Sequence, residues 1–150
     1  MGSAAMGLLD EWLAGKALLL GDGAMGTMLQ SAGLEPGDAP EGLNLVNPKA
    51  VGAVHEAYLS AGADVLTTNT FGGNRIRLAL HDLHARTDAL NRAGAEIARE
   101  AVGTCGRRVL VAGSVGPTGA LLQPVGDLPF EEARDAFSQQ CRSLAEGGVD

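Results

Sequence analysis

The stretch from Leu18 to Thr27, LLLGDGAMGT, constrains the fold more than any other part of the sequence. Its leucines predict a short buried strand, because so brief an apolar run, ended by glycine, does not make a helix. Gly21, Gly23 and Gly26 surround one acid, Asp22, and the residues that follow can begin a helix. Such a turn exposes unpaired backbone N–H groups that suit an anion, and its carboxylate suits a cation. The turn therefore predicts a site for a ligand with both charges, such as an amino acid.

The same order of elements recurs twice further along the chain. Residues 64–71 (DVLTTNTF) are apolar at first and polar at their carboxyl end, which predicts a second strand ended by glycines. Arg108–Ala112 predicts a third strand, followed by the glycine-rich residues 113–119, and the first strand is expected over Ala17–Leu20. Helical spacing or cap signals predict helices over residues 8–13, 25–32, 48–61, 74–80, 87–100 and 130–146.

Three details of these elements can be compared with a structure. Asn47–Pro48 is a typical helix start, and Thr87 is expected to cap the helix after it. Residues 33–47 form a long polar loop, which in a compact domain is usually functional or mobile. The last helix is predicted to turn inward the face that carries Phe130, Ala133, Phe137, Cys141 and Leu144.

Alternating apolar strands and helices predict an α/β fold with a parallel sheet covered on both faces. With 150 residues and 45% hydrophobic residues, the chain is long enough for one domain, and residues 1–5 are expected to be a tail. Polar residues gather at the carboxyl end of every strand: Asp22, then Thr68, Asn69 and Thr70, then Ser114. Ligand sites lie at that edge both in (β/α)8 barrels and in open doubly wound sheets, and three strands fit either.

Charge and cysteine content exclude several classes of function. The net charge of −7, with no run of Lys or Arg, argues against nucleic acid and anionic membrane surfaces as partners. No apolar run approaches the ~20 residues of a membrane span. The two cysteines lie far apart and predict neither a disulfide framework nor a metal-ligand pair, so a reducing cytoplasm is the expected location.

A dinucleotide site is an alternative for the glycine turn, because Gly21, Gly23 and Gly26 satisfy G-x-G-x-x-G between a strand and a helix. Two features oppose it. Asp22 would repel a pyrophosphate, and no acid ends the second strand at the expected distance of about 20 residues. A nucleotide-binding α/β domain therefore remains the weaker interpretation.

Three motifs resemble those of the homocysteine S-methyltransferase family: Asp22–Thr27 (DGAMGT), Thr68–Phe71 (TNTF) and Gly116–Gly119 (GPTG). Within that family, the likeness is greatest to the amino-terminal homocysteine-binding module of cobalamin-dependent methionine synthases. It runs from about Leu8 to Asp150. The resemblance implies a (β/α)8 barrel, of which residues 1–150 would form the amino-terminal part with about three βα units.

The resemblance also implies roles for individual residues. Asp22 and the amides of Gly23 and Ala24 would hold the charged end of homocysteine. Asn69 and Thr70 would line the pocket, with Ser114 at the end of the third strand. In the family a zinc ion, held by three cysteines of later strands, presents the homocysteine thiolate to a methyl donor. Those cysteines would lie after Asp150, so this chain is expected to hold no zinc ligands, and methylcobalamin, with folate- and cobalamin-binding modules, would belong to a larger protein.

Less specific interpretations remain open. A non-catalytic half-barrel that binds amino acids or assembles with a partner is a second alternative. Asp22 is also a candidate helix cap, and Thr68–Thr70 are also consistent with ordinary polar residues satisfied by the backbone. The side chains expected to serve packing or the surface rather than a site are His55, Arg75, Arg77, His81 and His84. Cys105 is expected in a turn at the face opposite the site.

Overall fold

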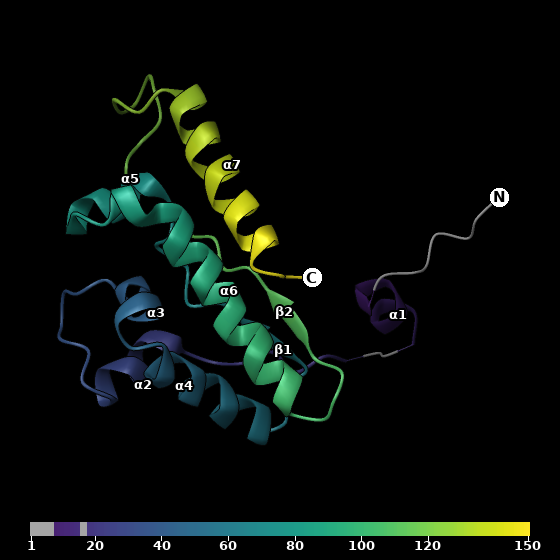
Figure 1. Cartoon of the computed structure of the whole chain (residues 1–150). Helices are drawn as coiled ribbons and strands as arrows, with labels where there is room; N and C mark the ends of the chain where they lie inside the picture. Colours follow the sequence, from purple (N-terminus) through teal and green to yellow (C-terminus); the bar gives the residue numbers. More distant parts are fainter. Residues whose placement is uncertain (1–7, 16–17) are drawn as a thin grey trace.

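A computed structural model describes residues 8–15 and 18–150. Two parallel strands, β1 (Val65–Thr67) and β2 (Leu110–Ala112), form the sheet in the register Val65–Leu110, Leu66–Val111 and Thr67–Ala112 (Figure 1). The predicted second and third strands are therefore confirmed but shorter than expected. The predicted first strand is only a single parallel bridge between Gly21 and Val65, and its first residue, Ala17, lies outside the described residues.

Helices make up most of the described chain. Three 3-10 turns lie between them, at Pro40–Gly42, Ala79–His81 and His84–Arg86. The α-helices are α1 (Leu8–Gly15), α2 (Met25–Ser31), α3 (Leu43–Val46), α4 (Pro48–Ser60), α5 (Arg75–Leu78), α6 (Thr87–Thr104) and α7 (Phe130–Glu146). All six predicted helices are present, and α3 is an element that the sequence did not predict.

Two helix starts were predicted, with different outcomes. The Asn47 side chain accepts a hydrogen bond from the Ala50 amide at 3.3 Å, which confirms the cap of α4. Thr87 is instead the first residue of α6, and its hydroxyl donates to the His84 carbonyl at 2.7 Å. The prediction that Thr87 caps α6 was therefore wrong, because its hydroxyl bonds back to the preceding turn.

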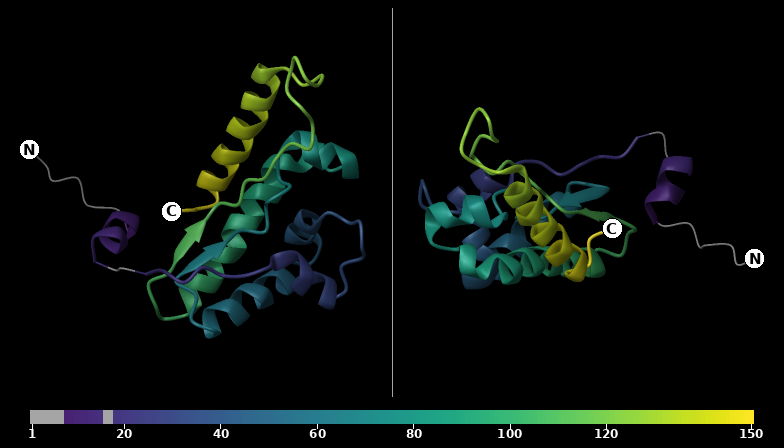
Figure 2. Two further views of the ribbon diagram at one scale, coloured as in Figure 1. Left: turned by 180° about the vertical axis from the view of Figure 1, so that it is seen from behind. Right: turned by 90° about the horizontal axis from the view of Figure 1, so that it is seen from above.

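The helices form a layer against the two strands. Helix α4 packs on β1, α6 packs on β2, and α7 packs along α6 (Figures 1 and 2). Leu18 and Leu20, from the predicted first strand, remain exposed. The prediction that these leucines form a buried strand was therefore wrong for Leu18 and Leu20. Two clusters form the apolar core: Leu59, Ala63, Leu66, Ala101 and Val109, then Leu29, Leu34, Val51 and Val54.

The buried face of α7 differs from the predicted one. Ala133 and Leu144 are buried as expected, but Cys141 is exposed and Phe130 is 66% exposed. The buried side instead includes Gln140 and Ser143. Apolar spacing alone missed this face, because polar side chains of α7 are satisfied by polar partners on α6.

Helix α1 stands apart from the other elements in both views (Figure 2). An ion pair between Glu11 and Arg108 links it to the start of β2. Within residues 8–15 and 18–150, no helix combines the length and the apolar character that crossing a bilayer needs.

Candidate functional site

A cavity of about 640 Å³ lies at the carboxyl ends of the strands. Its walls come from the residues after β1, from the loop after β2, and from residues 37–41 of the long loop. Three of the predicted site residues, Asn69, Thr70 and Ser114, line this cavity. The structure thus brings together residues from two strand ends, as parallel strands require.

Hydroxyl groups fix the floor of the cavity. Thr70 Oγ1 donates to the Ser114 carbonyl at 2.8 Å, and the Ser114 amide donates to Thr68 Oγ1 at 2.9 Å. The two threonine hydroxyls lie 2.6 Å apart, and Thr68 donates there because Thr70 has already given its only hydrogen to Ser114. Thr70 is fully buried, so it supports Ser114 rather than contacting a ligand. No described residue bonds the Ser114 hydroxyl, which can therefore serve a ligand.

Asn69 is held by a second asparagine. Its Nδ2 donates to Asn44 Oδ1 at 2.9 Å and to the Pro40 carbonyl at 2.8 Å. Asn44 Nδ2 returns a bond to the Asn69 carbonyl at 2.8 Å. Both hydrogens of the Asn69 amide are used, while its Oδ1 accepts no bond from the described residues. Asn69 can therefore offer an acceptor to a ligand.

Glu41 is a cavity residue that sequence analysis missed. Its side chain is only 5% exposed and lines the cavity, and Oε1 accepts the Gly72 amide at 2.6 Å. The other carboxylate oxygen has no hydrogen-bond partner among the described residues. Glu41 lies in the segment that was predicted as a long loop, and no periodicity there distinguishes one residue from another. The only sequence signal for Glu41 was that a loop of this length is usually functional.

Asp22 lies beside the cavity rather than in its wall. Its Oδ2 accepts the Thr67 amide at 2.8 Å and its Oδ1 accepts the Thr67 hydroxyl at 2.9 Å. Thr67 itself lines the cavity. Helix α2 is capped at Ala24 with no side-chain hydrogen bond, so Asp22 does not cap it. Each carboxylate oxygen keeps a second acceptor site, and Asp22 can still bind a cation.

The predicted anion-binding amides are free. Gly23 and Ala24 are exposed, and their backbone N–H groups donate to no acceptor among the described residues. Neither residue lines the 640 Å³ cavity, although Met25 and Gly26, which follow them, do. The turn and the cavity are thus adjoining parts of one region.

His55 of α4 is a buried histidine without a partner. It is 0% exposed, and neither ring nitrogen has a hydrogen-bond partner among the described residues. Burial lowers the pKa of His55 to about 4, against the opposing effect of the Asp22 charge. His55 is therefore neutral near pH 7, which leaves the Asp22 carboxylate without a neighbouring histidine cation.

Other predicted surface residues separate into two groups. Arg77 and His81 line the cavity, so their expected assignment to the surface alone was incomplete. Arg75 instead donates to the Glu132 carbonyl at 3.3 Å, and His84 lies in a 3-10 turn outside the cavity wall.

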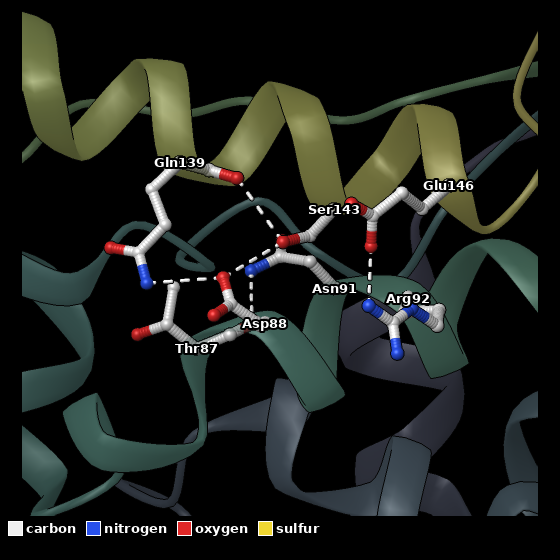
Figure 3. Close-up of polar contacts among 7 residues, drawn as sticks. All are labelled: Thr87, Asp88, Asn91, Arg92, Gln139, Ser143 and Glu146. Atoms are coloured by element: carbon white, nitrogen blue, oxygen red, sulfur yellow. Dashed lines mark hydrogen bonds and ion pairs between the residues drawn. The ribbon is translucent and has the colours of Figure 1, made fainter.

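Polar contacts join α6 to α7 outside the cavity wall. Asp88 Oδ1 accepts from Ser143 Oγ at 2.9 Å and from Gln139 Nε2 at 3.0 Å, and Arg92 pairs with Glu146 (Figure 3). A further residue of α7 reaches the floor itself. Gln140 Nε2 donates to the Thr70 carbonyl at 2.8 Å.

The chemistry available at this region is binding and orientation. No three His, Cys, Asp or Glu side chains converge on a possible metal site within the described residues. Ser114 has no base beside it among its described contacts, so these residues provide no activated serine. Free amides, two carboxylates and an arginine are suited to a small ligand with both charges.

Comparisons with known proteins identify relatives over nearly the whole chain. Residues 19–150 match the family model described as homocysteine S-methyltransferase. The methionine synthase of Mycobacterium tuberculosis is 37% identical over 142 residues, and that of Mycobacterium leprae 35% identical. Each match covers 89% of this chain but only 12% of the relative, so the chain spans a small part of the length of these proteins.

Solved structures of a homocysteine methyltransferase also resemble this chain. The metallated form of the homocysteine methyltransferase MmuM from Escherichia coli superposes with a TM-score of 0.79 at 29% identity, over 95% of this chain and 55% of that one. Its oxidized form gives a TM-score of 0.76 at 28% identity, over 92% and 52%.

Proposed function

Because the chain belongs to the homocysteine S-methyltransferase family, we propose that it carries the homocysteine-binding part of a methionine-forming methyltransferase. The observation that supports this most is the free glycine turn beside a polar cavity at the strand ends. A thiol amino acid has an ammonium group and a carboxylate, and the region offers a partner to each.

Each proposed site residue has a distinct role. Asp22 binds the ammonium group, and the amides of Gly23 and Ala24 bind the carboxylate. Asn69 Oδ1 and the Ser114 hydroxyl contact the ligand from the cavity floor. Thr70 keeps Ser114 in place through its bond to the Ser114 carbonyl.

The rest of the proposal concerns the whole protein. We propose that residues 1–150 form the amino-terminal part of a (β/α)8 barrel, for which parallel pairing and helices on the sheet are the support. The described residues do not fit a zinc ion, since they lack three converging ligands. Zinc, if the family's chemistry applies, would be held outside this chain, and the methyl donor, methylcobalamin or another, would meet the thiol there. The free thiols Cys105 and Cys141 suit a reducing cytoplasm as its location.

Calorimetric titration of the chain with L-homocysteine and with NAD, each with and without zinc, tests this function. We expect saturable binding of homocysteine that does not need zinc, and no heat with NAD. Binding of NAD alone would favour the nucleotide-binding alternative. Binding of neither ligand would leave a half-barrel that serves assembly.

A further inference from the structure

Tyr58 of α4 lies directly against the glycine turn. Its hydroxyl donates to the Ala24 carbonyl at 3.0 Å. A Cβ atom added to Gly23 would lie 2.8 Å from the same hydroxyl oxygen, closer than real Cβ atoms approach. Gly23 therefore lets the turn lie on the tyrosine ring, and the hydroxyl fixes the next carbonyl of the turn.

The helix that carries Tyr58 is well anchored. Asn47 caps its first turn, and Val51, Val54 and Leu59 are buried in the two apolar clusters. His55 lies three residues before Tyr58 and is fully buried. The Tyr58 hydroxyl is thus a fixed point, whereas the turn has exposed glycines on both sides of Asp22 and would otherwise sample many conformations.

We propose that Tyr58 is a positioning residue for the amino-acid ligand. Its bond to Ala24 holds the turn in the conformation that presents the amides of Gly23 and Ala24 and the Asp22 carboxylate together. Because the ligand groups must meet three donors and acceptors at once, a turn free to move would bind more weakly. This inference rests on the proposed binding of homocysteine at the turn.

The sequence offers a direct way to observe this residue. Tyr58 is the only tyrosine in the chain. Labelling with 3-fluorotyrosine therefore gives one fluorine resonance, which reports on the ring beneath the turn. We expect saturating L-homocysteine to shift that resonance, and an unrelated amino acid such as alanine at the same concentration to shift it less.

Substitution gives the second readout. Tyr58→Phe keeps the ring and removes the hydroxyl, and we expect it to raise the Kd for homocysteine by about three- to tenfold, the usual range for one lost hydrogen bond. Ser60→Ala, which removes an exposed hydroxyl two residues further along α4, serves as the matched control and should leave the Kd unchanged.

The outcomes separate the two proposals. A parent chain that binds no homocysteine contradicts the proposed function, and this inference with it. Binding of homocysteine with an unmoved fluorine resonance contradicts the role of Tyr58 alone, and it does so even if Tyr58→Phe fails to fold. A folded Tyr58→Phe chain with a lower Tm but an unchanged Kd also overturns it, because the tyrosine would then serve stability only.

Discussion

Both carboxylate oxygens of Asp22 accept hydrogen bonds from Thr67, one from its amide at 2.8 Å and the other from its hydroxyl at 2.9 Å. The two residues are 45 positions apart in the chain. Thr67 is the last residue of β1 and lines the cavity, so this pair joins the glycine turn to the cavity wall. The pair also fixes the direction of the one carboxylate in the turn, which we propose binds the ligand's ammonium group.

Loss of the Asp22 charge should weaken recognition of the ammonium group. We expect Asp22→Asn to bind L-homocysteine more weakly by ~1–3 kcal/mol, the scale for a lost charged hydrogen-bond partner. Its binding of mercaptobutyrate, which lacks the amino group, should change much less. Calorimetry with both thiols measures the difference directly.

Glu41→Gln is the matched control for that experiment. Glutamine can still accept the Gly72 amide, which Glu41 accepts at 2.6 Å, while the charge is removed. We expect this variant to keep the preference for homocysteine over mercaptobutyrate. If Glu41→Gln lost the preference and Asp22→Asn kept it, Glu41 would be the ammonium-binding carboxylate and our assignment would be wrong.

The tight turn after β1 should not accept a side chain at Gly73. A Cβ atom there would lie 2.3 Å from Asn91 Oδ1, 2.7 Å from Gln140 Nε2 and 2.8 Å from the Thr70 carbonyl oxygen. We expect Gly73→Ala to lower the free energy of unfolding by about 1–3 kcal/mol, as overpacking does. In Gly52→Ala, the new Cβ on α4 would make an ordinary 3.7 Å contact with Ile97 of α6, and the substitution should stabilise by roughly 0.5–1 kcal/mol. Urea denaturation compares them, and equal stabilities would contradict the packing described at Gly73.

Stability should fall in mild acid because His55 is buried and neutral. Its pKa in the folded chain is about 4, against an ordinary value of 6.5. Between pH 6.5 and pH 4, the His55 ring is protonated in the unfolded chain but stays neutral in the folded one. His55 therefore costs no stability above pH 6.5, and the free energy of unfolding falls as the pH is lowered toward 4. The full loss of unfolding free energy that comes from His55 is about 3 kcal/mol.

His55→Leu isolates that effect from the titration of carboxylates. Neither ring nitrogen has a partner among the described residues, so an apolar replacement leaves no bond broken. We expect the difference in unfolding free energy between parent and variant to change by about 3 kcal/mol from pH 7 to pH 4. A constant difference over that range would show that His55 titrates normally.

The sequence predicted the helices better than the sheet. The bounds of α7 agree with the prediction, residues 130–146, because apolar periodicity marks a long helix clearly. Its buried face was mispredicted, since Gln140 and Ser143 are buried by pairing with polar groups of α6 and of the turn after β1. A pattern of apolar residues cannot reveal such pairing. The first strand is reduced to one bridge at Gly21, a pairing that depends on the rest of the sheet.

The candidate site was predictable where it follows strand ends. Asn69, Thr70 and Ser114 were named because parallel strands bring their carboxyl ends to one edge, and all three line the cavity. Glu41 and Asn44 were missed because residues 33–47 were predicted as one long loop. In the structure Glu41 lies in a 3-10 turn and Asn44 in α3, and contacts rather than periodicity decide where their side chains lie. The bond from Tyr58 to Ala24 likewise depends on how α4 packs beneath the turn.

Exposed apolar side chains should make the isolated chain prone to self-association. Leu18, Leu20, Phe71 and Val125 are all more than half exposed. We expect residues 1–150 to self-associate or to bind a hydrophobic dye, because exposed apolar surface promotes association. Light scattering and dye fluorescence measure this. A monodisperse monomer that binds no dye would contradict the expectation that these exposed side chains promote association.

Mapping the amide shifts of the isotope-labelled chain during titration with L-homocysteine tests the central proposal most directly. We expect the largest changes at the backbone amides of Gly23 and Ala24, with further changes at Asn69 and Ser114, and little change at residues of the α6–α7 contact such as Asp88. Shifts confined to the α6–α7 contact, or no shifts at millimolar homocysteine, would contradict the binding of homocysteine at the glycine turn.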